Sequence, residues 1–200
     1  MVKFFFASSH LCDFALKSSH SMKKPAVFVD RDGTLIEEVN FLSRLEDLRV
    51  FPFTPPAIKL LKDKGFHVIV LTNQSGIARG MYTESDMHEI HDQIQIEVNG
   101  GIDAFYFCPH LPSAECHCRK PNLGMILSAR ADFEIDMERS WMVGDKNLDV
   151  EIAANAGVSS ILVLTGYGLK HQAGLKETPG SVVEHFGEAV ERILSLERPR

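Results

Sequence analysis

The chain has 200 residues, of which 44% are hydrophobic, enough for one domain with a buried core. Its formal net charge of −6 argues against a general nucleic-acid or membrane-surface binder. An anionic ligand would have to be bound by a few individually positioned cationic side chains. No run of about 18 apolar residues occurs, which argues against a membrane-spanning helix. We therefore expect a soluble, cytoplasmic protein that binds neither nucleic acid nor membranes, with a monomer as the default.

The first 22 residues are interpreted as an N-terminal extension that precedes a single domain over residues 23–200. Phe4–Phe6 forms a short apolar cluster, but the segment lacks the apolar core and the small-residue cleavage site of a signal peptide. Met22 comes directly before Lys23-Lys24-Pro25 and the first convincing strand, and it has the features of a natural start. We expect the extension to pack poorly and to carry no chemistry.

Short apolar runs alternate with helical patterns along the rest of the chain. The runs are rich in Val, Ile and Phe and do not alternate with polar residues, which is typical of strands buried on both faces. Thr83 and Asp86 have the spacing of a helix capping box. The pattern predicts an α/β fold with a doubly wound parallel sheet and helices on both faces. The expected order is strand 26–29, helix 54–64, strand 67–71, helix 83–98, strand 104–107, helix 124–132, strand 141–143, helix 149–156, strand 160–164 and helix 181–196.

Polar motifs follow the first four of these strands. Asp30 and Asp32 follow the first, Thr72–Ser75 the second, Cys108 begins a polar loop after the third, and Gly144–Lys146 ends the fourth. Ligands of parallel α/β sheets bind at the carboxyl ends of the strands. The four motifs are therefore expected to meet at one site.

Asp30 and Asp32 are two residues apart at a strand end, so extended backbone sends their side chains the same way. One ionised carboxylate can act as nucleophile and metal ligand while the other passes protons. Gly33 allows a sharp turn after them. The alternative reading is a plain polar strand end, since Asp and Gly are common there.

The other motifs carry groups suited to a phosphate ester. Thr72–Gly76 offers hydroxyl and amide groups beside a glycine, although a simple turn explains that motif equally well. Lys120 is a point cation that can neutralise a phosphoryl group, although a lone lysine is more often a solvated surface residue. Asp145 can hold a divalent cation together with Asp30, and oxygen ligands of this kind suit magnesium.

In this order, four motifs resemble those of the haloacid dehalogenase superfamily of phosphatases: Asp30-x-Asp32-Gly33-Thr34, Thr72-Asn73, Lys120 and Gly144-Asp145-x-x-x-Asp149. The resemblance covers roughly residues 26 to 165 and implies a Rossmann-like fold. It implies that Asp30 is the nucleophile that becomes an aspartyl-phosphate and that Asp32 is the acid and base. Thr72 and Lys120 would steady the phosphoryl oxygens. Magnesium would bind Asp30, the backbone carbonyl of Asp32, and Asp145. An aspartate at position 32 favours hydrolysis, because both half-reactions need proton transfer.

Three of the four cysteines lie within eleven residues of the loop after the third strand. Cys108, His110, Cys116 and Cys118 offer three thiolates and one imidazole, the ligand set of a closed, structural zinc site. Disulfides are the alternative, but an odd trio beside a histidine argues against them. His117 is interpreted as exposed, Cys12 as a free thiol, and His88 and His91 as part of a solvated helix face.

The zinc loop narrows the resemblance to a branch that contains the D-glycero-D-manno-heptose 1,7-bisphosphate phosphatases and the histidinol-phosphate phosphatases. Thr72-Asn73-Gln74-Ser75-Gly76 is more similar to the heptose enzymes, so a small phosphorylated sugar is the expected substrate and histidinol phosphate the alternative. Asn40-Phe41 stands where the heptose enzymes usually have a glycine followed by a tyrosine. No segment between two predicted strands is long enough to form a separate cap domain. The resemblance implies substrate contacts from Glu38, Val39, Asn40, Phe41, Thr72, Asn73, Gln74, Ser75, Arg119, Lys120 and Lys146.

A protein that keeps this fold but only senses a phosphorylated metabolite is the rival to an enzyme. The enzyme is favoured because all four catalytic positions hold the residue type that the chemistry needs: Asp30, Asp32, Thr72 and Lys120.

Overall fold

The computed structural model describes residues 23–197, so the expected extension over residues 1–22 and its Cys12 lie outside the described part of the chain. Six parallel strands form one sheet in the order β3-β2-β1-β4-β5-β6. The strands are β1 (Ala26–Val29), β2 (His67–Asn73), β3 (Ala104–Cys108), β4 (Trp141–Gly144), β5 (Ser159–Val163) and β6 (Ser181–Val183).

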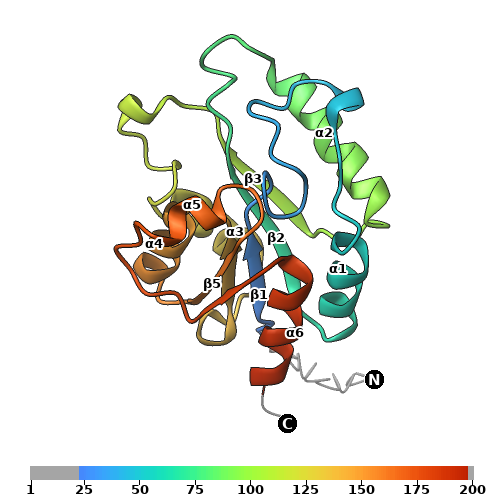
Figure 1. Cartoon of the computed structure of the whole chain (residues 1–200), viewed down its shortest axis with the longest axis vertical. Helices are drawn as coiled ribbons and strands as arrows, with labels where there is room; N and C mark the ends of the chain where they lie inside the picture. Colours follow the sequence, from blue (N-terminus) through green and yellow to red (C-terminus); the bar gives the residue numbers. More distant parts are fainter. Residues whose placement is uncertain (1–22, 198–200) are drawn as a thin grey trace, which may run out of the picture.

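Helices connect the strands and cover both faces of the sheet (Figure 1). Alternation along β1 divides the core, because Val27 and Val29 face one set of helices while Ala26 and Phe28 face the other. Helices α1, α2 and α6 pack on the first face, and α3 and α4 on the second. The expected doubly wound α/β fold is confirmed. The helices are α1 (Thr54–Asp63), α2 (Glu84–Glu97), α3 (Gly124–Asp132), α4 (Asn147–Ala156), α5 (Gly168–Gln172) and α6 (Phe186–Leu196).

The expected helix over residues 181–196 is wrong in its first part. Ser181–Val183 is a short edge strand that pairs with Ile161–Val163, and α6 begins only at Phe186, after the side chain of His185 accepts a hydrogen bond from the amide of Glu188. Two adjacent β-branched valines favour a strand over a helix, and the helical period of the following residues hid them. The short helix α5 was also not expected.

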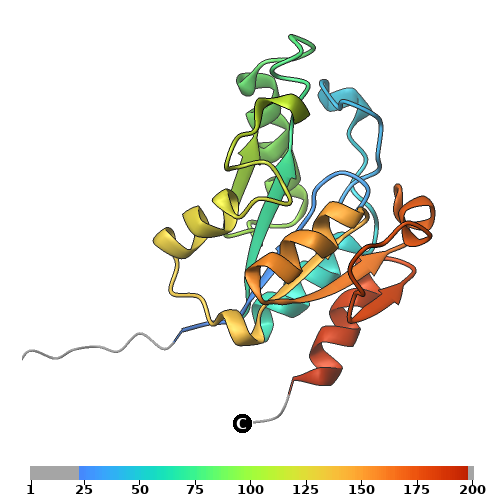
Figure 2. The same ribbon diagram turned by 90° about the vertical axis from the view of Figure 1, so that its left-hand side faces the viewer.

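The chain reverses its direction of winding between β1 and β4, the two neighbouring strands in the middle of the sheet. A crevice at the carboxyl ends of such a pair is the usual ligand site of this architecture. Figure 2 shows the segments around residue 45 and around residue 80 standing at the same end of the molecule, above these strand ends. The predicted polar motifs lie at the carboxyl ends of β1, β2, β3 and β4 and therefore at this end of the sheet.

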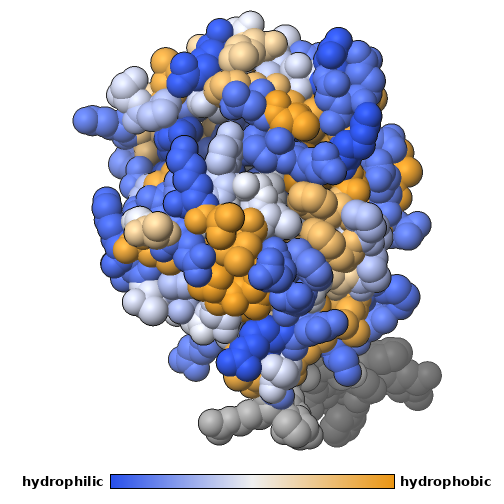
Figure 3. All heavy atoms as spheres, in the orientation of Figure 1, coloured by the Kyte–Doolittle hydropathy of each residue, from blue (hydrophilic) through white to orange (hydrophobic). Residues whose placement is uncertain are grey.

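The surface drawn in Figure 3 is largely hydrophilic, with hydrophobic side chains in separate groups. Among residues 23–197, no helix has the length and apolar character needed to cross a membrane.

Candidate active site

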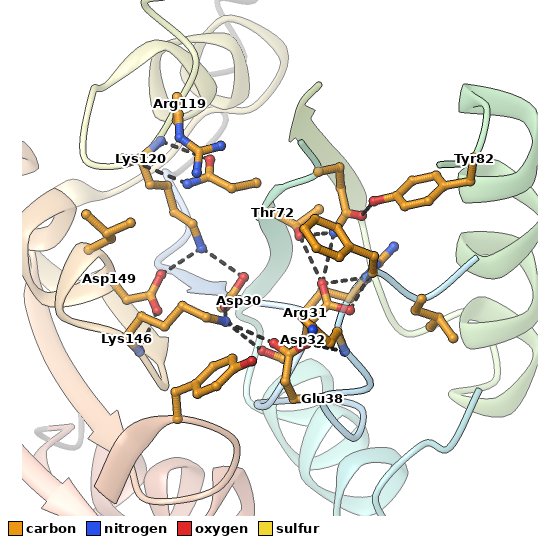
Figure 4. A pocket seen from close by; sticks show the side chains of 17 residues that line it. Asp30, Arg31, Asp32, Glu38, Thr72, Tyr82, Arg119, Lys120, Lys146 and Asp149 are labelled. Carbon is orange, nitrogen blue, oxygen red and sulfur yellow. Dashed lines mark hydrogen bonds and ion pairs between the residues drawn. The ribbon is translucent and has the colours of Figure 1, made fainter. Parts of the chain in front are cut away.

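A cavity of about 200 Å³ opens at the carboxyl ends of the central strands (Figure 4). Most of the predicted site residues line it. Val39 and Ser75 are not part of the lining, and Asp145 is fully buried beside Lys146. The predicted residues that do line the cavity are Asp30, Asp32, Glu38, Asn40, Phe41, Thr72, Asn73, Gln74, Arg119, Lys120 and Lys146.

Lys120 is a buried cation in this cavity. Its ammonium donates hydrogen bonds to Asp30 Oδ1 at 2.8 Å, to Asp149 Oδ1 at 2.6 Å and to the carbonyl of Leu71 at 2.8 Å. Asn73 fixes the backbone of Lys120, because its side chain accepts from the Lys120 amide at 3.0 Å and donates to the Lys120 carbonyl at 3.3 Å. The side chain of Asn73 thus holds Lys120 in place.

Asp30 faces two ammonium groups. Burial by itself raises the pKa of Asp30, but the charges of Lys120 and Lys146 outweigh this effect and hold the pKa well below its usual range. The Nζ atom of Lys146 lies 3.3 Å from Asp30 Oδ2. Asp30 is therefore ionised at neutral pH, which is the state that a carboxylate nucleophile requires.

The ammonium of Lys146 contacts four oxygens. It lies 3.0 Å from Asp145 Oδ1, 3.3 Å from the backbone carbonyl of Asp32 and 3.4 Å from Glu38 Oε2, in addition to its contact with Asp30. The oxygens of Asp30, Asp32 and Asp145 are those predicted to hold magnesium. The bound ammonium marks this position as favourable for a cation, and an oxygen-only donor set suits Mg²⁺.

If all were ionised, the carboxylates in this part of the site would carry more charge than the two lysines balance. Asp30, Asp145 and Asp149 each place one oxygen within 4.8 Å of the others. Burial and the nearby charge of Asp30 together raise the pKa of Asp145 to about 8, against the opposing charge of Lys146. An excess of buried negative charge of this kind fits an additional divalent cation.

Two glycines make room for these carboxylates. A Cβ atom on Gly33, whose φ is +82°, would lie 2.3 Å from Asp145 Oδ2. A Cβ atom on Gly144 would lie 2.2 Å from Asp149 Oδ2. Both positions therefore require glycine for steric reasons, and Gly33 also requires it for its left-handed backbone.

Asp32 is held by a separate set of side chains, on the other side of the cavity from Lys120 (Figure 4). Arg31 binds both of its carboxylate oxygens, with Nε 3.1 Å from Oδ2 and Nη2 2.9 Å from Oδ1. Gln74 Nε2 donates to Oδ2 at 2.9 Å, and the Thr72 hydroxyl lies 3.4 Å from the same oxygen. Tyr82 donates to Gln74 Oε1 at 2.5 Å and thereby orients the amide.

Sequence reasoning missed Arg31, Tyr82 and His91 in this part of the site. The interpretation of His91 as a solvated residue is wrong: it is 4% exposed, lies 3.1 Å from Arg31 and stacks on Phe105. His88 is exposed as expected. The position of His91 one turn after the buried Met87 was the available signal, since both lie on the same face of α2.

The loop over residues 38–41 forms one wall of the cavity. Asn40 and Phe41 both have left-handed backbone, with φ of 53° and 68°, so the glycine usual in this turn is replaced without losing the turn. The Asn40 amide donates to Glu38 Oε1 at 2.8 Å. The guanidinium of Arg79 lies 5.7 Å from the centre of the Phe41 ring, which links this loop to the segment after β2.

The sulfur cluster consists of Cys108, His110, Cys116 and Cys118. Their donor atoms lie within 4.8 Å of one another, with 3.5 Å between the sulfurs of Cys108 and Cys116 and 3.2 Å between His110 Nδ1 and Cys118 Sγ. The three thiols form no disulfide. Hydrogen bonds from Cys108 and from backbone amides outweigh desolvation and lower the pKa of Cys116 to about 7. Three thiols and an imidazole converging on one point are the donors of a closed zinc site.

Comparison with known proteins agrees with this geometry. A HAD-hydrolase-like family model matches residues 117–189. A D-glycero-D-manno-heptose-1,7-bisphosphate 7-phosphatase of Thermosynechococcus vestitus is 39% identical over 90% of this chain and all of the relative. The chain belongs to this phosphatase family of HAD-like hydrolases. The expected resemblance to the haloacid dehalogenase superfamily and its heptose branch is confirmed.

Other members of the family are similar to the same extent. The D-glycero-beta-D-manno-heptose-1,7-bisphosphate 7-phosphatase of Escherichia coli K12 is 38% identical over 74% of this chain and 84% of its own length. The D-glycero-alpha-D-manno-heptose-1,7-bisphosphate 7-phosphatase of Photorhabdus laumondii is 38% identical over 72% of this chain and 85% of its own length. A crystal structure of the D,D-heptose 1,7-bisphosphate phosphatase of B. bronchiseptica with magnesium and phosphate has a TM-score of 0.80 and 32% identity, and covers 86% of this chain and 99% of that one.

Proposed function

We propose that this phosphatase removes the C7 phosphate of D-glycero-D-manno-heptose 1,7-bisphosphate by way of an aspartyl-phosphate on Asp30. The observation that carries the chemistry is the buried, ionised Asp30 held between Lys120 and Lys146 at the floor of the cavity. The names of the relatives, together with full-length similarity to one of them, support the substrate.

The first half-reaction transfers the phosphoryl group to the protein. An oxygen of Asp30 forms a bond to phosphorus while the bond between phosphorus and the sugar oxygen breaks. The leaving oxygen takes a proton from Asp32, so the sugar departs as a neutral alcohol. Lys120, already 2.8 Å from Asp30, offsets the repulsion between a carboxylate and a phosphate dianion.

The second half-reaction returns the enzyme to its starting state. Asp32, now ionised, removes a proton from a water molecule as the water oxygen attacks phosphorus. The bond between phosphorus and Asp30 breaks, and inorganic phosphate and the free carboxylate are released. The hydroxyl of Thr72 donates to the phosphoryl oxygens in both steps.

Magnesium fits the oxygen set that Lys146 contacts, which is formed by Asp30, the Asp32 carbonyl and Asp145. When bound there, a divalent ion supplies positive charge that makes a phosphate dianion compatible with the carboxylates. A cation held by these oxygens would take the place of the Lys146 ammonium, so we expect the ammonium to turn toward the substrate phosphate in the loaded enzyme. The contact of Lys146 with Glu38 lies on the cavity side and supports this assignment.

Zinc fits the sulfur cluster, where four protein donors leave no position for substrate. Its role would be structural. The loop that carries Cys116 and Cys118 continues directly into Arg119 and Lys120, both of which line the cavity. A fixed sulfur cluster therefore keeps both cations in position. Thiolate ligands of this kind also suit a reducing compartment, which supports a cytoplasmic location.

Substrate recognition is assigned to the cavity walls. Among the described residues, the guanidinium of Arg119 is bonded only to the carbonyl of His110, at 3.3 Å, and it lines the cavity. It therefore suits the second phosphate of a bisphosphate. Glu38, Asn40 and Phe41 are assigned to the sugar. Residues 23–200 would act as one phosphatase domain without a separate cap, as a monomer.

The decisive measurement compares substrates side by side. We expect kcat/KM for heptose 1,7-bisphosphate, tested as both anomers, to exceed that for histidinol phosphate and for a generic sugar monophosphate by at least about a hundredfold. A preference for histidinol phosphate would contradict the substrate assignment. Magnesium-dependent phosphate release that is lost in Asp30→Asn separates an enzyme from a non-catalytic sensor, which would bind these compounds without turnover.

A further inference from the structure

Arg31 is a buried charged side chain at the site that no catalytic step uses. Its side chain is 1% exposed, and its three guanidinium nitrogens have fixed partners. Two of them bind Asp32 through both carboxylate oxygens, in the fork geometry that fixes a carboxylate in its plane. The third, Nη1, lies 3.1 Å from His91 Nε2.

The backbone around Arg31 makes this arrangement possible. The carbonyl of Arg31 accepts hydrogen bonds from the amides of Thr34, Leu35 and Ile36. The chain therefore turns back tightly after β1, and Gly33 provides the left-handed residue of that turn. Side chains of neighbouring residues on a straight strand point to opposite faces, and the turn is what brings Arg31 and Asp32 together.

His91 is built to accept this hydrogen bond. Burial, together with the charge of Arg31 and a smaller effect from His88, lowers the pKa of His91 to about 3. The imidazole is therefore neutral at neutral pH, with a lone pair on Nε2 and the proton on Nδ1. The ring stacks on Phe105 with 4.3 Å between centroids and 16° between planes, which fixes the direction of that lone pair.

We propose that Arg31 and His91 form a buried pair that positions Asp32 for proton transfer. Neither side chain touches the substrate in this account, so both are positioning residues. His91 belongs to α2 and supports Asp32 through Arg31. Tyr82, just before α2, supports Asp32 through Gln74. One segment of the chain thus holds the Asp32 side chain from two directions. A catalytic group that is misplaced by about 1 Å can lower the reaction rate about a hundredfold.

The pair should matter most where the leaving group needs its proton. A sugar or alkyl alcohol departs from phosphorus only with help from Asp32, whereas p-nitrophenolate departs without a proton. Poor positioning of Asp32 must therefore lower kcat/KM for an alkyl phosphate more than for p-nitrophenyl phosphate. General loss of structure would lower both values equally.

The test uses four variants with both substrates. His91→Phe keeps the stacking ring and removes the acceptor, and His91→Gln restores an acceptor. His88→Phe changes an exposed histidine one turn away, as a matched control. Asp32→Asn is the reference for complete loss of the acid. We expect His91→Phe to lower kcat/KM for a sugar phosphate at least tenfold and that for p-nitrophenyl phosphate less than threefold.

The remaining outcomes decide the proposal. His91→Gln should recover the sugar phosphate activity to within about threefold of wild type, and His88→Phe should match wild type. Equal losses on both substrates, or no recovery in His91→Gln, would overturn the positioning role. If His91→Phe does not fold, Arg31→Lys, which keeps the charge without the fork, must show the same selective loss.

This inference rests on the proposed role of Asp32, and the same experiment separates the two. If Asp32→Asn shows no selective loss for the sugar phosphate, the proposed mechanism itself fails. If Asp32→Asn shows it and His91→Phe does not, only the positioning pair fails. Neither result depends on the heptose assignment, because any alkyl phosphate that the enzyme hydrolyses can be used.

Discussion

The carboxylate cluster and the sulfur cluster are both suited to a metal ion, but they are built in opposite ways. Cys108, His110, Cys116 and Cys118 lie within eleven residues, at the end of β3 and on the loop that follows it. The carboxylates of Asp30 and Asp145 directly follow β1 and β4, and that of Asp149 comes from α4, more than a hundred residues after Asp30 in the chain. The sulfur cluster is formed by residues close together in the sequence, whereas the carboxylate cluster exists only when the sheet is assembled.

The two clusters also differ in their charges. Two lysines already contact the carboxylates, and a cation at that site adds to an existing ion network. In the part of the chain that the structure describes, no lysine or arginine pairs with a sulfur of the other cluster. We therefore expect loss of metal to affect catalysis at the first cluster and stability at the second.

The largest expected effect is that of Asp30→Asn. An amide is a far weaker nucleophile than a carboxylate, so phosphate release should fall by at least about a thousandfold. The melting temperature and the zinc content should stay near those of wild type, because the sulfur cluster is separate. Asp63→Asn, which changes an exposed carboxylate paired only with Lys59, serves as the control. Residual activity above about a tenth of wild type would rule out Asp30 as the nucleophile.

The next largest effect is expected from removing zinc. Cys116→Ala or a strong chelator should lower the melting temperature by more than about 10 °C, since metal binding contributes directly to the stability of a loop site of this kind. Turnover should fall as Lys120 loses its fixed position, while Mg²⁺ affinity, measured by calorimetry, should change by less than about threefold. Ser113→Ala, on the same exposed loop, is the matched control. An unchanged melting temperature would contradict a structural zinc site.

These two clusters also show what a sequence reveals. The sulfur ligands are predictable because their order and spacing lie in one short segment. The carboxylates are predictable as strand-end residues, since buried strands are easily recognised and parallel strands expose their carboxyl ends at one edge. Asp149 was harder to assign, because its contacts with Lys120 and with the Lys146 amide depend on how α4 meets β1.

The support for Asp32 was not predictable in the same way. Arg31 reads as an ordinary residue after a strand, and only the turn at Gly33 directs it to Asp32. His91 reads as polar on a helix surface, although its position one turn after Met87 places it on a buried face of α2, where it stacks on Phe105. The strand β6 was mistaken for helix because three residues give too little periodicity to distinguish the two.

The clusters should also differ in their response to acid. Protons would compete with zinc at the sulfur cluster, whereas His91, on the side of the carboxylates, stays neutral in the folded protein and takes up a proton on unfolding. Burial and the charge of Arg31, with a smaller effect from His88, lower the pKa of His91 to about 3 in the folded protein, so between pH 6.5 and about 3 the unfolded chain binds a proton that the folded one does not. Stability should therefore fall by about 1.4 kcal/mol per pH unit below pH 6.5 from this residue.

His91→Gln isolates that contribution from zinc release. The variant has no titrating group at this position, so its free energy of unfolding, measured by urea titration with zinc present, should fall less steeply than that of wild type between pH 6.5 and pH 5. Parallel slopes for wild type and His91→Gln would show that zinc release alone causes the acid sensitivity.

The smallest effect is expected at Lys146, and it tests the charge difference directly. Because its ammonium contacts the oxygens of Asp30, Asp32 and Asp145, it competes with Mg²⁺ in the absence of substrate. Lys146→Met keeps the length of the side chain and removes that competitor, so Mg²⁺ binding measured by calorimetry should tighten by about tenfold, or about 1.4 kcal/mol.

Zinc affinity should not change in Lys146→Met, because the sulfur cluster has no internal cation to displace. Lys170→Met, an exposed lysine on α5, should leave both affinities unchanged. The same variant should bind substrate more weakly, since the ammonium that turns toward the phosphate is gone. Weaker Mg²⁺ binding in Lys146→Met would mean that the ammonium holds the carboxylates together for the ion instead of competing with it. The two clusters would then share the same design, a preassembled set of ligands, and differ only in their donor atoms.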